Sequence, residues 1–415
     1  MQTSLADFIR DTPDGREADA ILRKCVHCGF CTATCPTYQL LGDELDGPRG
    51  RIYLMKQALE GGEVTQKTQL HLDRCLTCRA CETTCPSGVQ YGRLLDIGRK
   101  VVDQRVQRPA WQRSARRALA QGLPRTSLFG PLLKLGQLAR PMLPHSLSTR
   151  VPERVPNRGI WPAPRHARKM IALAGCVQPA LAPDINAAAA RVLDRLGISL
   201  IEVPGTGCCG AVRYHLNFQS DGLQDMRALI DAWWPRVAQG VEAIVMTASG
   251  CGVTVKEYGH LLERDPRYAE KARRISALTR DICEIAAPEM NSLERLASGS
   301  ASGAPRRIAF HPPCTLQHGQ QLKGVTERIL AAAGFELVPV PDAHLCCGSA
   351  GTYSILEPQL AERLKRNKLA ALRAGAPQAI ATANIGCQTH LQSGTQIPVK
   401  HWITLLDERL GRCAP

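Results

Sequence analysis

Residues 25–36 read CVHCGFCTATCP and residues 75–86 read CLTCRACETTCP, so one cysteine spacing occurs twice within a short segment. In each run two gaps of two residues and one gap of three separate the four cysteines, and a proline follows the fourth. Two-residue gaps let three thiolates on a tight loop bind one iron–sulfur cube, while the fourth cysteine turns away into the next helix. The two runs therefore predict two [4Fe–4S] clusters.

We expect the fourth cysteine of each run to complete the cluster of the other run. Four-cysteine zinc sites are the main alternative, but they use two C-x2-C pairs separated by a longer loop and not three successive cysteines. His27, inside the first loop, is expected to be exposed or hydrogen-bonded and not to be a ligand. The expected ligand sets are Cys25, Cys28, Cys31 and Cys85 for one cluster, and Cys75, Cys78, Cys81 and Cys35 for the other.

The chain has 415 residues, 18 of them cysteine, and a formal net charge of +15. This length can bury a sizeable core and suggests two or three domains. The N-terminal residues lack an apolar leader, so we expect a cytoplasmic protein with reduced cysteines that are available as metal ligands. No apolar run is long enough to span a membrane, so we expect any membrane contact to be peripheral.

Most of the positive charge lies in residues 101–170. This segment contains twelve Arg and two Lys against only Asp103 and Glu153, and it also contains nine prolines. The prolines predict an extended or broken-helix arm in place of one long helix. Apolar residues at 128–138 lie beside basic ones, so the arm is suited to link domains, to dock on a partner subunit or to lie on a membrane surface. We do not expect it to bind nucleic acid.

The remainder of the chain is duplicated. The sequence AARVLDRLGISLIEVPGTGCC ends at Cys209, and the similar TERILAAAGFELVPVPDAHLCC ends at Cys347. Helical segments alternate with short apolar strands in both copies, which predicts two related α/β units with mostly parallel sheets. Cys176, Cys208 and Cys209 recur 138 residues later as Cys314, Cys346 and Cys347, and Cys251 recurs 136 residues later as Cys387.

Each copy has four thiols, which is enough for a metal site. Adjacent cysteines reach one centre only where the backbone bends, and Gly210 and Gly348 permit such a bend. The alternative is that these cysteines are buried apolar residues, because free cysteine packs readily in cores. Cys283 and Cys413 have no counterpart and are expected to be incidental. The possible ligands are Cys176, Cys208, Cys209 and Cys251 in the first unit, and Cys314, Cys346, Cys347, Cys387 and His390 in the second.

Residues 205–210 also match the dinucleotide-binding pattern G-x-G-x-x-G. The duplicate at residues 342–348 keeps the cysteine pair but loses the first two glycines, so we reject a nucleotide site. An electron-transfer chain without its own organic cofactor implies a partner that supplies one.

The predicted fold class is α+β multidomain: an α-helical two-[4Fe–4S] ferredoxin-like domain followed by a duplicated pair of α/β units. The expected divisions are residues 1–100 for the two-cluster domain, 101–170 for the basic arm, 171–300 for the first unit and 301–415 for the second. We expect one N-terminal helix within residues 1–24 and another at 51–60, which Gly61 and Gly62 end.

This plan resembles the iron–sulfur subunits of flavin-dependent hydroxyacid and glycerol-phosphate dehydrogenases, with two CCG domains after the ferredoxin domain. Residues 25–55, 74–99, 344–354 and 382–390 are most similar to the iron–sulfur subunits of bacterial glycolate oxidases. The resemblance implies FAD-containing partner subunits that oxidise glycolate to glyoxylate, and electron delivery to membrane quinone. It also implies a peripheral position on the cytoplasmic face of the bacterial inner membrane, with no catalytic residue on this chain.

Other functions remain open at this stage. The sister complexes oxidise lactate or glycerol 3-phosphate, and no residue of this chain identifies the substrate. The CCG units also resemble the catalytic subunit of heterodisulfide reductase, which suggests a CCG-dependent disulfide reductase. In that subunit the late cysteine belongs to a C-x2-C pair, whereas this chain has Thr254 and His390 at the partner positions. Relatives also often have a further cysteine where this chain has Pro312.

Overall fold

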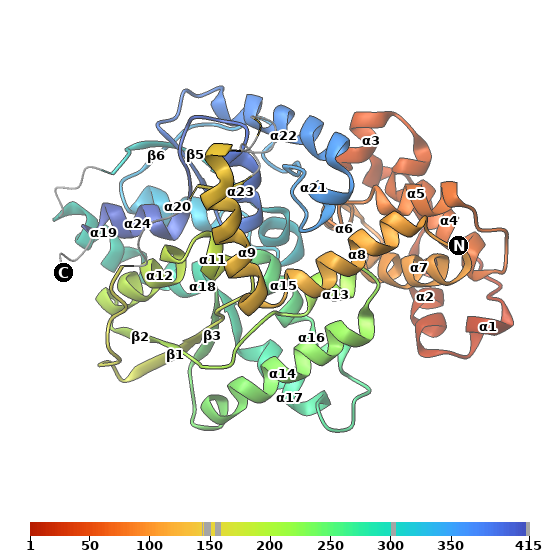
Figure 1. Cartoon of the computed structure of the whole chain (residues 1–415), viewed down its shortest axis with the longest axis horizontal. Helices are drawn as coiled ribbons and strands as arrows, with labels where there is room; N and C mark the ends of the chain where they lie inside the picture. Colours follow the sequence, from red (N-terminus) through yellow and green to blue (C-terminus); the bar gives the residue numbers. More distant parts are fainter. Residues whose placement is uncertain (143, 145–150, 154–158, 300–303, 412–415) are drawn as a thin grey trace.

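The computed structural model describes residues 1–142, 144, 151–153, 159–299 and 304–411. A group of N-terminal helices lies at one end of the molecule, and two α/β units make up the rest (Figure 1). The expected α+β multidomain fold is therefore confirmed. The predicted boundary between the two α/β units, at residues 300 and 301, lies outside the described residues.

The N-terminal part is entirely helical among its described residues. Prolines begin several of its helices, because the first helical position needs no backbone N–H donor and favours the fixed φ angle of proline. Its elements are α1 (Asp7–Arg10), α2 (Pro13–Lys24), η1 (Phe30–Thr32), α3 (Pro36–Leu41), η2 (Glu44–Asp46), α4 (Pro48–Leu59), α5 (Gln66–Asp73), α6 (Ala80–Thr84) and α7 (Tyr91–Arg105).

The expectation of a single N-terminal helix is wrong, because α1 and α2 are separate. Thr12 is the N-cap of α2, where its hydroxyl accepts a hydrogen bond from the Gly15 amide at 3.0 Å, and Pro13 occupies the first turn. A capping threonine followed by proline starts a new helix and does not continue the previous one. The helix predicted at 51–60 is present as α4, which begins earlier, at Pro48, and ends before Gly61 at φ +88°.

The first α/β unit contains a four-stranded parallel sheet of order β2-β1-β3-β4. Its strands are β1 (Arg168–Ala172), β2 (Ile198–Glu202), β3 (Ala243–Met246) and β4 (Thr279–Asp281). Its helices are α11 (Gln178–Leu181), α12 (Asp184–Arg195), α13 (Ala211–His215), α14 (Gln219–Ala238), α15 (Ser249–Lys256), α16 (Tyr258–Leu261), α17 (Ala269–Leu278), α18 (Ile282–Ala286), η4 (Ala287–Glu289) and α19 (Met290–Ser298).

The second unit repeats this topology, with a parallel sheet of order β6-β5-β7-β8. The duplication predicted from the cysteine spacing is thus confirmed at the level of strand order. Its strands are β5 (Arg307–His311), β6 (Glu336–Leu337), β7 (Ala379–Thr382) and β8 (Val399–His401), and its helical segments are η5 (Thr315–Gly319), α20 (Val325–Ala332), α21 (Tyr353–Leu356), α22 (Pro358–Arg373), α23 (Ile385–Gln392) and α24 (Trp402–Arg409).

The two units share one apolar core, which includes residues from both sheets and from α12 and α24. A buried ion pair crosses this interface. The guanidinium of Arg191 on α12 donates to both carboxylate oxygens of Asp407 on α24, with Nη2–Oδ2 at 2.6 Å. Because both side chains are at least nine-tenths buried, each charge depends on the other for stabilisation.

The basic arm contains two helices, α8 (Ala110–Gly122) and α9 (Thr126–Ala139), followed by η3 (Arg140–Met142). Pro124 lies between the helices, as expected of a broken-helix arm, whereas Pro131 is accommodated inside α9. No side chain of α9 is buried, and Leu132, Leu135 and Leu138 are exposed along it. None of the helices in the described part of the chain has the length and apolar character that crossing a membrane requires.

The arm packs on its own protein through part of its positive charge. Arg108 and Arg116 both form ion pairs with Asp73 at the end of α5, and both are largely buried. At the other end of α8, the Arg213 side chain donates to the Ala120 carbonyl at 3.0 Å. The helix α8 therefore joins the N-terminal part to the first α/β unit.

We predict that Asp407→Ala lowers the free energy of unfolding by about 3 to 5 kcal/mol, because it leaves the Arg191 guanidinium buried without its counter-ion. Thermal unfolding followed by circular dichroism measures the change. The control is Glu242→Ala, which breaks an exposed pair with Arg168 and should cost less than about 1 kcal/mol. Equal losses for the two variants would contradict the proposed dependence on burial.

Candidate metal centres

The two cysteine loops have matching backbone geometry. His27 and Gly29 have positive φ angles of 55° and 84°, and Thr77 and Arg79, at the same places in the second run, have φ angles of 53° and 58°. Left-handed residues curl a loop tightly, and non-glycine residues adopt this conformation only where the surroundings enforce it. The repeated strain indicates that both loops are shaped to wrap around an object of the same size.

A first cavity lies inside the N-terminal loop. The sulfur-bearing residues that line it are Cys25, Cys28, Cys31 and Cys85, together with Cys81 at its border. Burial raises the pKa of the Cys31 thiol to about 11, and the nearby Cys25, Cys28 and Cys85 thiols raise it further. Four thiolates can share this space only with a cationic centre between them.

A second cavity adjoins the first and is lined by Cys35, Cys75, Cys78 and Cys81. Burial also raises the pKa of the Cys35 thiol and raises that of Cys81 well above its usual value. Tyr91 lines both cavities, and its hydroxyl donates to the Cys75 sulfur at 3.7 Å. The structure thus brings together the two crossed cysteine sets that the spacing predicts.

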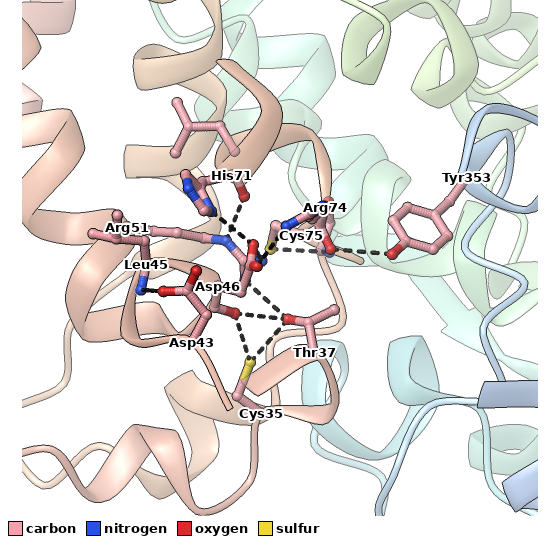
Figure 2. A network of polar contacts seen from close by, with 12 residues as sticks. Cys35, Thr37, Asp43, Leu45, Asp46, Arg51, His71, Arg74, Cys75 and Tyr353 are labelled. Carbon is pink, nitrogen blue, oxygen red and sulfur yellow. Dashed lines mark hydrogen bonds and ion pairs between the residues drawn. The ribbon is translucent and has the colours of Figure 1, made fainter. Parts of the chain in front are cut away.

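A buried polar network supports the second cavity (Figure 2). Asp46, which is fully buried, accepts hydrogen bonds from Arg74 at 2.8 Å and from Arg51 at 3.4 Å, and it contacts the His71 ring at 3.1 Å. Arg51 also donates to the His71 carbonyl at 2.7 Å. These contacts fix the segment between the two cysteine runs.

The same network reaches the cysteine ligands. Arg51 donates to the Thr37 hydroxyl at 3.1 Å, and this hydroxyl lies 3.3 Å from the Cys35 sulfur. Arg51 and Arg79 line the second cavity, and the Arg79 guanidinium forms a two-point ion pair with Glu257 in the first α/β unit, at 2.6 and 2.9 Å. Positive charge held in a low-dielectric site favours an added electron. A cluster in the second cavity therefore has a raised reduction potential.

The four cysteines of the first α/β unit form a continuous line of thiols. Cys208 contacts both Cys176 and Cys209, and Cys209 contacts Cys251. Hydrogen bonds from the Cys176 and Cys209 thiols, with the positive charge of Arg213, hold the pKa of Cys208 well below its usual value. One thiolate among three neutral thiols is the arrangement that this pattern favours.

The second unit has the equivalent line, but it is connected to the N-terminal part. Cys346 contacts Cys314 and Cys347, and Cys347 contacts Cys387. The Cys314 thiol also contacts Cys78, which lines the second cavity. His390 lies on α23, and its buried Nε2 has no hydrogen-bond partner among the described residues.

The glycines after the cysteine pairs have the predicted role. Gly210 and Gly348 have φ angles of +83° and +90°, and a Cβ atom at either position would lie within 3 Å of a backbone oxygen, that of Gly222 or Ala361. A side chain at either position would therefore collide with the helix that follows. The backbone bend after each cysteine pair is confirmed.

The sequence interpretation missed His311 as a member of the second group. Its ring lies beside the Cys347 and Cys387 sulfurs, with the three ligand atoms within 4.8 Å of one another. The signal available in the sequence was its place at a strand end, where the first copy has Leu173, 138 residues earlier. Cys283 is buried in the apolar core, and Cys413 lies outside the described residues.

Comparison with known proteins agrees with this geometry. Residues 21–89 match the "4Fe-4S dicluster domain" model, and residues 171–256 and 308–392 each match the "Cysteine-rich domain" (CCG) model. Over 412 residues the chain is 56% identical to the "Glycolate oxidase iron-sulfur subunit" of Escherichia coli (strain K12), covering 99% of this chain and 100% of that protein. The chain belongs to the family of glycolate oxidase iron–sulfur subunits.

Two more distant relatives of this subunit family are informative. The "Probable glycolate oxidase iron-sulfur subunit" of Bacillus subtilis (strain 168) is 29% identical over 405 residues, covering 90% of this chain and 89% of that protein. "Lactate utilization protein A" of Bacillus licheniformis is 26% identical over 243 residues, covering 56% of this chain and 97% of that protein. As an iron–sulfur subunit, the chain carries two [4Fe–4S] clusters, and the adjoining cysteine-lined cavities fit two cubes.

We predict that Tyr91→Phe lowers the reduction potential of the cluster associated with Cys75, because the variant loses the hydroxyl that donates to the Cys75 sulfur. A net hydrogen-bond contribution of about 1 kcal/mol corresponds to roughly 40 mV for a one-electron couple. Potentiometric titration followed by electron paramagnetic resonance measures it. Tyr53→Phe, on the exposed face of α4, is the control. An unchanged potential in Tyr91→Phe would show that this hydroxyl does not act on the cluster.

Proposed function

We propose that this chain is the electron-transfer subunit of a glycolate oxidase (glycolate dehydrogenase) complex. FAD-containing partner subunits oxidise glycolate to glyoxylate, and the chain passes the electrons towards membrane quinone. The observation that carries the proposal is the pair of adjoining cysteine-lined cavities in a chain that matches a glycolate oxidase iron–sulfur subunit along its whole length. The chain itself contributes no catalytic residue to glycolate oxidation.

Within this function we assign crossed cluster ligation. The pKa values of the thiols support the sets, because Cys31 is influenced by Cys25, Cys28 and Cys85, and Cys81 by Cys75, Cys78 and Cys35. Crossed ligation ties the two runs into one unit and keeps the two cubes close. The proposed ligands are Cys25, Cys28, Cys31 and Cys85 for one cluster, and Cys75, Cys78, Cys81 and Cys35 for the other.

The surroundings of the cavities support a direction of transfer. Cys28 is exposed, and the side chains of Val26 and Phe30 beside it are 68% and 61% exposed. Exposed apolar residues around a redox centre are suited to contact with a partner protein. We assign this surface to the FAD-containing subunit, because the second cavity is covered by the CCG units through Cys314 and Glu257.

The proposed location is peripheral, on the cytoplasmic face of the bacterial inner membrane, where quinone accepts the electrons. We retain the four-part division at residues 1–100, 101–170, 171–300 and 301–415, with the last helix of the first part, α7, continuing to Arg105. A second candidate function is the equivalent role in lactate oxidation, which the similarity to lactate utilization protein A supports.

The deciding experiment is to purify the chain anaerobically with its native partners, identify them and assay dye reduction. We expect flavin-containing partners and dye reduction that depends on glycolate. Reduction with lactate or glycerol 3-phosphate but not glycolate would replace the proposed substrate. Turnover of a disulfide substrate by the isolated chain would favour a CCG-dependent reductase instead.

We predict that Cys35→Ser removes the cluster bound by Cys75, Cys78 and Cys81, because the fourth ligand crosses between the runs. Iron content should fall from about eight atoms towards about four, with the magnetic resonance signal of the other cluster retained. Cys283→Ser, in the apolar core, is the control and should keep all the iron. Loss of only the cluster bound by Cys25, Cys28 and Cys31 would reject the crossed scheme.

The basic arm is proposed to dock on the partner subunits through those arginines that are not used internally. The initial expectation that Arg116 belongs to the docking surface is wrong, because it is mostly buried against Asp73. Arg113 and Arg117 are exposed on the same helix. The docking charge therefore lies on the outer face of α8.

We predict that reversing Arg113 and Arg117 to Glu weakens partner binding by roughly tenfold or more, since each basic group near an anionic surface contributes about 1 kcal/mol. Co-purification at several salt concentrations measures this, and the cluster spectra should not change. Reversing the exposed Arg273 and Arg274 on α17 is the control with equal charge change. If the Arg113 and Arg117 variant co-purifies normally, the arm is a linker. If it is released only from membranes, the arm binds lipid.

A further inference from the structure

The side chain of His311 is the buried polar group that the proposed electron-transfer role does not use. It lies at the end of β5 and is fully buried, and both ring nitrogens lack a hydrogen-bond partner among the described residues. A neutral imidazole offers one donor and one acceptor. Leaving such groups unpaired in a protein interior costs about 1–3 kcal/mol each. The ring therefore requires a partner that protein atoms do not supply.

The atoms nearest to this requirement are sulfurs. The Cys347 and Cys387 thiols lie with the His311 nitrogen within 4.8 Å of one another, and all three residues are buried. Cys347 follows a sheet strand and Cys387 lies on α23, so three separate elements bring these ligands together. Imidazole nitrogen and thiolate sulfur are the ligand types that zinc and iron prefer.

Fold duplication provides an internal comparison. At the position 138 residues earlier, the first unit has Leu173, which packs in an apolar core. The fold therefore accepts a leucine at the end of this strand, and packing does not require a histidine. Another buried histidine, His401, has both nitrogens bonded: Nε2 to the Thr247 carbonyl at 2.7 Å and Nδ1 to the Ile403 amide at 3.2 Å. His311 differs from it in lacking both bonds.

We propose that the second CCG unit holds a single zinc or iron ion, separate from the two cubanes, bound by His311, Cys347 and Cys387. Three protein ligands leave one tetrahedral position. His390 is suited to it, because its Nε2 is buried without a partner among the described residues and it lies one helical turn after Cys387. The set replaces the sequence-based one, in which all four cysteines of the unit were ligands.

The line of thiols relates this site to the clusters. Cys347 contacts Cys346, which contacts Cys314, and Cys314 contacts Cys78 at the second cavity. A metal ion at His311 thus fixes the far end of the segment that covers this cavity. The proposal does not depend on the identity of the substrate or on electron transfer, because it concerns metal content alone.

The test uses the full chain, purified anaerobically with both clusters, and measures iron and zinc by mass spectrometry. Beyond the roughly eight irons of two cubanes, we expect about one further metal ion per chain in the unmodified protein. His311→Leu, which installs the residue of the first unit, should lose that ion and keep the cubane spectra. His401→Gln is the matched control and should keep it. X-ray absorption at the edge of the additional metal should show mixed sulfur and nitrogen ligands.

Two results would overturn the proposal: no metal beyond the cubane iron in the unmodified protein, or full retention of the additional ion in His311→Leu. If His311→Leu does not fold, His311→Cys carries the test, because it keeps a metal-binding side chain at this position. It should retain the ion with one nitrogen ligand replaced by sulfur. An unchanged ligand shell in that variant would show that the ion is bound elsewhere.

Discussion

The convergence of eight thiols on two adjoining cavities is the constraint on which the N-terminal part depends. Buried thiolates repel one another and lose hydration, so they are stable together only around cationic iron. Crossing the fourth cysteine of each run makes each cavity depend on both runs. The helices between the runs must therefore return the chain to its starting point, and the prolines at Pro36 and Pro48 begin helices at the turns that do so.

Arginines distribute the charge of the two cavities unequally. Arg51 is buried beside the second cavity and is held there by Asp46 and Thr37, whereas Arg49 at the first cavity is partly exposed and pairs with Glu44. A buried cation acts through a lower effective dielectric than an exposed one. The second cavity therefore favours the reduced state more strongly. Electrons that enter at the exposed first cavity would move downhill towards the CCG units.

The CCG units combine a scaffold with a set of contacts to the clusters. Their shared core and the buried Arg191–Asp407 pair make them one body, on which the cluster-bearing loop rests. Arg79 in that loop pairs with Glu257 of the first unit, and Cys78 contacts Cys314 of the second. The second cluster site is thus fixed from both repeats. A duplicated fold allows this, because each copy presents its cysteine pair at the same strand ends.

The sequence by itself determined the cluster number, the duplication, the parallel strands and the bends at Gly210 and Gly348, because these depend on local spacing and on residues with special backbone freedom. It did not determine the separation of α1 from α2, which a single cap decided. Tertiary structure alone decided that Arg116 is internal and that His311, not all four cysteines, completes a group in the second unit. Those outcomes depend on which side chains meet across distant segments, and spacing along one chain carries no record of such contacts.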